Sequence, residues 1–314
     1  MSDSPTGGRL PDFLIVGHHK SGTTALYEML RRHPQIFMPE LKEPQYFATD
    51  MPARLAGETR PGLPTTLEQY VALFAPAGPD QIVGEASPQY LRSETAAGEI
   101  AAVAPGAKII AIFREPASFV RSLHLQLAQS GTETELDLRR AVENERVERA
   151  GRTRLRYSDH VRYAEQLQRY EDAFPREQIL ALIYDDYRAD NEATVRKVLA
   201  FLGVDEAVPV QAIQSNPTVG TRASGLNRAV KAVTAGEGRA GKALNRTIKS
   251  VLPQSARRRA LRTTHDRLLY GEPPPVDEQL MAELRERYAG EVDALGRHID
   301  RDLLDLWGYA PAAR

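Results

Sequence analysis

Four short, mainly apolar runs stand out in the hydrophobic pattern of this 314-residue chain. They are residues 13–17 (FLIVG), 81–85 (QIVGE), 108–113 (KIIAIF) and 178–184 (QILALIY). Nearly continuous runs of this length are typical of strands that are buried on both faces of a parallel sheet. Helical periodicity between the runs indicates βαβ units. The predicted fold class is therefore α/β, with three layers and a central parallel β-sheet flanked by helices.

The predicted helices share a repeat of apolar positions three and four residues apart. They cover a segment that opens at Gly22 and stops at His33-Pro34, and then residues 67–74, 93–103, 116–130, 135–149, 158–173, 192–202 and 277–295. We expect a single domain, divided into an α/β core (11–222), a basic helical insertion or lid (223–270), and a C-terminal helix and tail (271–314).

The composition excludes several kinds of chemistry. The sequence has no cysteine, which rules out disulfides, thiolate nucleophiles and thiolate metal sites. Its formal net charge of −1 argues against a general nucleic-acid binder. No run approaches the roughly 18 apolar residues of a membrane span, and the first residues lack the apolar core of a signal peptide. We therefore expect a cytoplasmic protein.

Positive charge is concentrated in one segment. Between Arg222 and Arg267 there are twelve Lys or Arg residues against two acids, Glu237 and Asp266. The segment has the periodicity of two amphipathic helices. Three roles fit such a block: a solvated helix face, a lid over an anionic ligand, or contact with a membrane surface.

The run at 13–17 leads into a glycine frame that points to an anion site. Gly17, four residues and Gly22 precede Thr23 and a helix, which is the layout of a phosphate-binding loop. The fold is therefore expected to be P-loop-like. Nucleoside triphosphatases carry a lysine directly after the second glycine. Here the lysine is Lys20, inside the loop, where it would lie along the anion.

A second anion site is indicated after the run at 108–113. Arg114 follows this predicted strand at once, and Ser122 comes eight residues later. Because the carboxyl ends of parallel strands meet at one edge of the sheet, Arg114 and the Lys20 loop are expected at the same edge. An adenosine with phosphate groups at both its 5′ and 3′ ends would satisfy both sites.

Four stretches together resemble the sulfotransferases that use 3′-phosphoadenosine 5′-phosphosulfate (PAPS), especially the bacterial branch related to heparan sulfate sulfotransferase domains. FLIVGHHKSGTTAL resembles the family's 5′-phosphosulfate loop, and IIAIFREPASFVRSL its 3′-phosphate segment. LKEPQYF resembles the segment that carries the catalytic base, and GEASPQYL a recurrent motif of the second strand. The ending RDLLDLW is also similar to the family's C-terminus.

The resemblance implies a role for each matched residue of the donor site. Lys20 would bridge the sulfonate and the 5′-phosphate and stabilise charge on the leaving group. The 5′-phosphate would be held by Ser21, Gly22, Thr23 and Thr24. Arg114 and Ser122 would bind the 3′-phosphate. Relatives close this site with a basic loop that YGEPPPVD replaces here, so Arg222 is our candidate for closing it.

The resemblance also implies a carboxylate base and no metal ion. Glu43 would deprotonate the acceptor hydroxyl for in-line attack on sulfur. His18, His19 and His124 are the alternative bases, because an unperturbed histidine has a pKa suited to the task.

The expected reaction is transfer of a sulfuryl group to a hydroxyl of a small metabolite, glycan or glycolipid. Relatives of the heparan sulfate type have lysine where this chain has Ala86, which weakens the inference to a sulfated polysaccharide. Two other functions remain open: an ATP-dependent P-loop kinase and a non-catalytic nucleotide-binding protein. The sequence does not predict the oligomeric state.

Overall fold

The computed structural model describes residues 8–51, 62–130, 132–133, 135–145, 157–209, 220–221, 270–271 and 274–309. These fall into two compact units. The first takes the described residues within Met1–Phe119, Gly151–Ser215 and Glu283–Arg314, and the second those within Val120–Ala150 and Asn216–Ala282. Arg222 and the predicted basic helices of 223–269 lie outside the described residues, so the expected domain division stays a prediction.

The first unit is built on a five-stranded parallel sheet of order β2-β3-β1-β4-β5. Its strands are β1 (Phe13–Gly17), β2 (Ile36–Phe37), β3 (Ile82–Ala86), β4 (Lys108–Phe113) and β5 (Ile179–Ile183). All four predicted strands are confirmed. β2 was not predicted, because two residues at the edge of a sheet leave no readable pattern. In the centre, Ile15 pairs with Ala86 on one side and Ile110 on the other.

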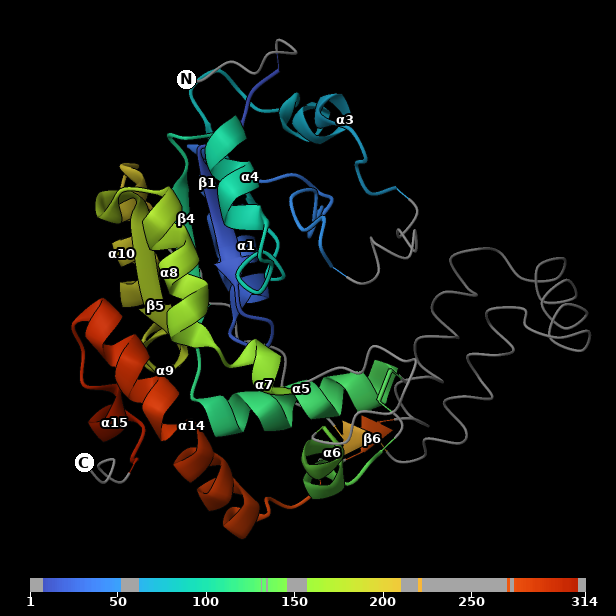
Figure 1. Cartoon of the computed structure of the whole chain (residues 1–314). Coiled ribbons are helices and arrows are strands. Elements are labelled where there is room, and N and C mark those ends of the chain that lie inside the picture. The colour runs from blue at the N-terminus through green and yellow to red at the C-terminus, as the bar shows by residue number, and fades with distance from the viewer. Residues whose placement is uncertain are drawn as a thin grey trace, which may run out of the picture. The chain divides into compact units, whose positions relative to one another are not determined.

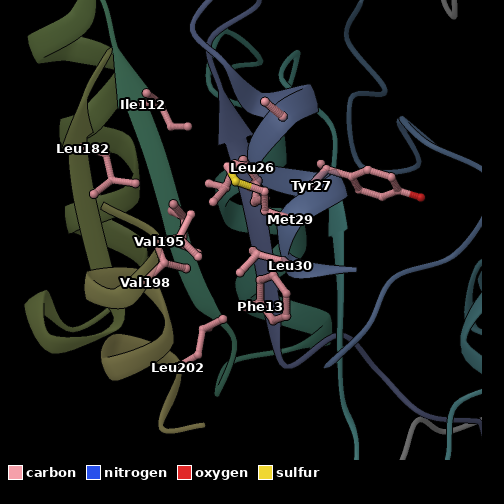
Figure 2. Packing of buried hydrophobic residues seen from close by; sticks show 14 of the residues in the cluster. Phe13, Leu26, Tyr27, Met29, Leu30, Ile112, Leu182, Val195, Val198 and Leu202 are labelled. Atoms are coloured by element: carbon pink, nitrogen blue, oxygen red, sulfur yellow. The ribbon is translucent and has the colours of Figure 1, made fainter. Parts of the chain in front are cut away.

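Helices cover both faces of this sheet, as the apolar runs predicted. Phe13 and Ile15 of β1 belong to one buried cluster with residues of α1 (Thr23–Leu30) and α10 (Asn191–Leu202). Figure 2 shows Phe13 of this cluster with Leu26 of α1 and Val198 of α10. The alternation of a strand turns Leu14 and Val16 toward the other face, where α4 (Ala96–Val103) and α8 (Tyr163–Ala173) lie (Figure 1). Burial of each such large side chain contributes about 1.5–3 kcal/mol.

The remaining helices largely follow the predicted pattern. They are α3 (Leu67–Val71), η1 (Ala72–Phe74), α5 (Pro116–Ser130), α6 (Leu138–Asn144), α7 (Tyr157–His160), η2 (Arg176–Gln178), α9 (Tyr184–Ala189), α14 (Glu278–Ile299) and α15 (Leu303–Leu306). The short helix α9 was not predicted, because YDDYRA has no apolar repeat. The predicted helix at 158–173 is interrupted before Tyr163. In the second unit, β6 (Gly220–Thr221) pairs antiparallel with β7 (Tyr270–Gly271).

The end of the described chain is fastened to the first unit by side-chain contacts. The indole Nε1 of Trp307 donates to Asp185 Oδ2 (2.9 Å), and the guanidinium of Arg301 forms a two-pronged pair with Asp186. The Tyr309 hydroxyl donates to Glu115 Oε1 (2.7 Å), directly after β4. Among the described residues, no helix is both long and apolar enough to cross a bilayer.

Candidate active site

The loop between β1 and α1 has the geometry of an anion site. Gly22 caps α1 in the left-handed conformation (φ 86°), and a Cβ atom there would lie 2.7 Å from Tyr187 Cε1, so only glycine fits. The first bond within the helix runs from Leu26 N to Gly22 O (3.0 Å). The N–H groups of Thr23 and Thr24 therefore have no acceptor within the helix, and they carry the positive end of its dipole.

Lys20 and Arg114 bring two positive charges to this loop. The Nη1 of Arg114 donates to the carbonyl oxygen of Lys20 (2.8 Å), which joins the ends of β1 and β4. Burial lowers the pKa of Lys20, and the neighbouring Arg114 charge lowers it further. In the described part of the chain, the Lys20 ammonium makes no ion pair or hydrogen bond. An anion bound between the two cations would relieve their mutual repulsion.

Arg114 is held in place from several sides. Its Nε donates to Ser118 Oγ (3.1 Å), its guanidinium lies 4.8 Å from the ring centroid of Tyr184, and its own carbonyl accepts from Tyr163 Oη (3.0 Å). The Glu115 carboxylate accepts hydrogen bonds from the backbone N–H groups of Ala117 and Ser118. It therefore caps α5 and does not form a hydrogen bond with the Arg114 guanidinium. Arg114 is therefore oriented before any ligand binds.

Glu43 is brought to the same edge of the sheet by its backbone and by Lys42. Its N–H donates to Ala86 O at the end of β3 (3.2 Å). The Lys42 ammonium donates both to Glu43 Oε1 (2.9 Å) and to Thr24 Oγ1 (2.9 Å) in the first turn of α1. The Glu43 carboxylate thus lies close to the anion loop, and its side chain is 25% exposed.

The three candidate histidines differ in their surroundings. His18 is buried against the rings of Phe119 and Tyr163, and its Nε2 is 2.8 Å from Gln166 Oε1. Burial lowers the pKa of His18 to about 3, which keeps the ring neutral. Burial also lowers the pKa of His19, although the negative charge of Glu43 opposes this shift. In the second unit, His124 is buried, with Nε2 3.1 Å from Leu136 O.

Four other residues are predicted to belong to the donor site: Ser21, Thr24, Ser122 and Arg222. Ser21 is buried and its Oγ donates to His19 O (3.3 Å), while Thr24 is exposed. Ser122 lies in the second turn of α5, and its buried Oγ has no hydrogen-bond partner among the described residues. Its role stays a prediction, and Arg222 lies outside the described residues.

A polar pocket lies beside the His18 end of the loop. It has a volume of about 380 Å³, and its lining includes Asp50, Arg92, Asp159, Gln166 and Arg169. Gln166 is the residue that contacts His18. Among the described residues, no group of three or more His, Asp or Glu side chains is arranged to hold a metal ion.

Several residues that contact Arg114 were not predicted from the sequence. Two of them could have been found there, because Tyr184 is the last residue of the apolar run at 178–184 and Ser118 follows Arg114 at the spacing of one helical turn. Tyr163 left no such signal, because its contact with Arg114 joins residues that are 49 positions apart.

An anion loop at the central strand of a parallel sheet defines an α/β protein of the P-loop-like class. The model of the sulfotransferase family matches residues 11–207, which is more than half of the chain. The chain belongs to the sulfotransferase family, and the resemblance stated from the sequence is confirmed.

Individual relatives agree with this assignment. The chain is 28% identical over 251 residues to carbohydrate sulfotransferase 15 of Mus musculus, an alignment that covers 62% of this chain and 44% of the relative. It is 34% identical over 116 residues to heparan sulfate glucosamine 3-O-sulfotransferase 6 of Homo sapiens (37% of this chain, 30% of the relative). The chain therefore spans less than half the length of these curated relatives.

The fold is also similar to a solved one. The crystal structure of a sulfotransferase from Alicyclobacillus acidocaldarius superposes with a TM-score of 0.58 at 27% identity, over 80% of this chain and 99% of that chain.

Proposed function

We propose that this protein transfers a sulfuryl group from PAPS to a hydroxyl of a small metabolite, glycan or glycolipid. The observation that carries the proposal is that Lys20 and Arg114 lie together at the α1 N-terminus. Arg114 Nη1 donates a hydrogen bond to the carbonyl oxygen of Lys20 (2.8 Å). Membership of the sulfotransferase family supports the reaction class. The donor is a polyanion, and these groups match its charge.

The donor-binding roles are those that the resemblance to the family implies. Backbone N–H groups and hydroxyls of Ser21 to Thr24 would hold the 5′-phosphate, and Lys20 would contact the sulfonate and the bridging oxygen. Arg114 would bind the 3′-phosphate, together with Ser122 and Arg222 as the motif predicts. As the bond between sulfur and the bridging oxygen breaks, negative charge collects on the leaving phosphate, and Lys20 would stabilise it. No metal ion is required for this step.

Glu43 would act as the general base. It takes the proton of the acceptor hydroxyl while that oxygen forms the new bond to sulfur, and 3′,5′-adenosine diphosphate leaves. Support comes from the Lys42 bridge, which connects the Glu43 carboxylate to Thr24 in the anion loop. His18 is less suited to the role, since its ring is buried and its pKa is about 3.

The acceptor is proposed from the pocket and the relatives. The mix of arginines, carboxylates and an amide in the pocket lining suits a ligand with several hydroxyl groups. Relatives are named as carbohydrate and glucosamine sulfotransferases, which supports a glycan acceptor within the proposed class.

Mass spectrometry tests the reaction. The protein is incubated with PAPS and a panel of sugars, glycolipids and phenols, with a chelator in place of Mg²⁺. We expect one panel compound to gain the mass of one SO₃ and 3′,5′-adenosine diphosphate to accumulate. Phosphoryl transfer from ATP that depends strictly on Mg²⁺ would instead establish the kinase alternative. Nucleotide binding without transfer to any compound would favour the non-catalytic alternative.

Glu43→Gln tests the base. The amide keeps the shape of the side chain and cannot take a proton, so kcat should fall by about 100-fold or more. Binding of 3′,5′-adenosine diphosphate should stay within about twofold of the wild type, because Glu43 is not a donor ligand. Full turnover in a folded Glu43→Gln protein would assign the base to His19 or another histidine.

A further inference from the structure

Glu85 at the end of β3 is a carboxyl group with no access to solvent. Its exposed fraction is 0%, and hydroxyl groups surround it. Tyr70 Oη donates to Oε1 (3.2 Å) and Ser87 Oγ donates to Oε2 (2.8 Å), and hydrogen bonding from the nearby Tyr90 hydroxyl lowers the pKa of the carboxyl group. A buried carboxylate with this many partners is a costly feature to keep, and the proposed reaction does not use it directly.

Two of these hydroxyls also hold the segment that carries Glu43. Ser87 Oγ accepts from Gln45 N (3.1 Å), and Tyr90 Oη accepts from Phe47 N (3.4 Å). A carboxylate can only accept hydrogen bonds, so it draws both hydroxyl hydrogens toward itself. The lone pairs of the two hydroxyls are then directed at the backbone N–H groups. The charge of Glu85 thus determines the direction of both hydroxyls.

The held segment has an unfavourable backbone. Glu43 has a φ of 58° and Gln45 a φ of 53°, both in the left-handed region that favours glycine. The N–H groups of residues 43, 45 and 47 bond in turn to Ala86 O, Ser87 Oγ and Tyr90 Oη. These alternating bonds to the 86–90 turn hold residues 43–47 in that conformation.

We propose that Glu85 is a positioning residue for Glu43. Its carboxylate orients the hydroxyls of Ser87 and Tyr90, these hold residues 43–47, and the Glu43 carboxylate is thereby set against the anion loop. The inference rests on the proposed function, in which Glu43 is the base.

The proton affinity of Glu85 makes this arrangement sensitive to pH. The pKa of Glu85 is raised to about 7: burial raises it most, the hydrogen bonds from Tyr90, Ser87 and Tyr70 lower it in part, and the neighbouring negative charge of Glu43 adds to the rise. When Glu85 is protonated, its own O–H needs an acceptor. A hydroxyl that accepts from this O–H must turn its own hydrogen away from the carboxyl group, which reorients the hydrogen bonds that hold residues 43–47. Turnover is therefore expected to rise as pH increases through about 7.

The test compares Glu85→Gln with Glu177→Gln, an exposed glutamate of η2 outside the pocket that is proposed to bind the acceptor. We would measure kcat and KM on the panel compound that turns over, from about pH 5.5 to about pH 8.5, together with hydrogen exchange of residues 43–47 corrected for the intrinsic rate. Glu85→Gln should lower kcat about tenfold or more, because a small displacement of a base is costly. It should also flatten the rise near pH 7, speed exchange at Gln45 and Phe47, and leave the KM for PAPS unchanged.

Ser87→Ala and Tyr90→Phe cover the case in which Glu85→Gln does not fold. Each removes one hydroxyl and keeps the carboxyl, and each should speed exchange at one N–H, that of Gln45 or that of Phe47. Unchanged exchange and an unchanged pH profile in the folded variants would overturn the inference while Glu43→Gln stays inactive. Full turnover in Glu43→Gln would instead show that Glu43 is not the base, and the proposed role of Glu85 would fall with that assignment.

Discussion

Lys20 is the residue on which the chemistry of the loop depends. Its side chain begins within the glycine frame, at a left-handed backbone position (φ 60°), rather than in the first turn of the helix. Arg114 holds the carbonyl of this same residue. The Lys20 ammonium would therefore lie beside a phosphate bound at the α1 N-terminus. In that position it could also contact a sulfonate attached to the phosphate.

Lys20→Ala should reduce turnover far more than it disturbs the fold. Loss of one group that stabilises developing charge typically costs about 100-fold or more in kcat. The free energy of unfolding should stay close to the wild-type value, because removing a partly buried cation beside Arg114 also relieves repulsion. Steady-state kinetics and urea denaturation measure the two quantities. Lys197→Ala, on the exposed face of α10, is the matched control, and an equal loss of activity in that variant would contradict the assignment.

Glu85 should give the stability of the fold an unusual pH dependence. Folding raises its pKa from 4.5 to about 7, so between these values the folded state binds more protons than the unfolded state. The stabilising contribution is complete below about pH 4.5 and is lost as pH rises through about 7, a change on the order of 3 kcal/mol. Glu85→Gln should remove this loss. Urea denaturation at several pH values measures it.

The matched control for this prediction is again Glu177→Gln. That variant should keep the wild-type dependence of unfolding free energy on pH. If the curves of the wild type and Glu85→Gln run parallel from about pH 5 to about pH 8, Glu85 does not titrate as described.

At the residue level, the sequence indicated the chemistry but not the contacts. Lys20, Arg114 and Glu43 were selected from short local motifs, and the structure brings them to one edge of the sheet. The bond from Arg114 to the Lys20 carbonyl joins residues 94 positions apart, which no local pattern encodes. The importance of Glu85 comes from its burial among Tyr70, Ser87 and Tyr90, which no local pattern encodes.

Among the elements, the junction of β1 and α1 is the least tolerant of change. Gly22→Ala would force a left-handed backbone on alanine and push its Cβ to 2.7 Å from Tyr187 Cε1. The strain should lower the free energy of unfolding by roughly 1–2 kcal/mol or more. Affinity for 3′,5′-adenosine diphosphate should also fall, since the first N–H groups of α1 move.

Gly98→Ala in α4 is the matched control for this element. A Cβ there meets nothing within 4 Å, so alanine should be neutral or stabilise the protein by about 0.5 kcal/mol. Thermal denaturation and calorimetric titration compare the two variants. Equal effects of the two substitutions would show that the loop does not require glycine at position 22.

The sequence predicted elements well where burial is two-sided. β1 and β4 read as strands because helices cover both of their faces, and the start of α5 at Pro116 follows from the fixed φ of proline. β2 and α9 were missed because neither has a repeat long enough to show a period. The break before Tyr163 was missed because the apolar positions of 158–173 continue across it.

In the first unit, the sheet order explains where the ligand belongs. After β1 the chain forms β2 and β3 on one side and later β4 and β5 on the other, so β1 lies at the point where the order reverses. Ligands of open parallel sheets bind at the carboxyl ends of the strands beside such a point. The Lys20 loop follows β1, Arg114 follows β4, and the motif after β3 holds Glu43.

Ligand binding at this point should stabilise the whole first unit. At a concentration about 100 times its Kd, 3′,5′-adenosine diphosphate should add about 2.7 kcal/mol to the free energy of unfolding. This corresponds to a rise in Tm of roughly 5 °C or more. Differential scanning calorimetry without Mg²⁺ checks it, with adenosine as the control that lacks both phosphates. Equal shifts for the two compounds would contradict an anion site.

The most direct measurement is calorimetric titration of 3′,5′-adenosine diphosphate, without Mg²⁺, into the wild type, Lys20→Ala, Arg114→Ala and the control Lys197→Ala. We predict that the wild type and Lys197→Ala bind equally well, and that each of the other two loses about tenfold or more in affinity, as expected for charge-assisted contacts to phosphate. Unchanged affinity in both Lys20→Ala and Arg114→Ala, or binding of ATP with Mg²⁺ alone, would contradict the account.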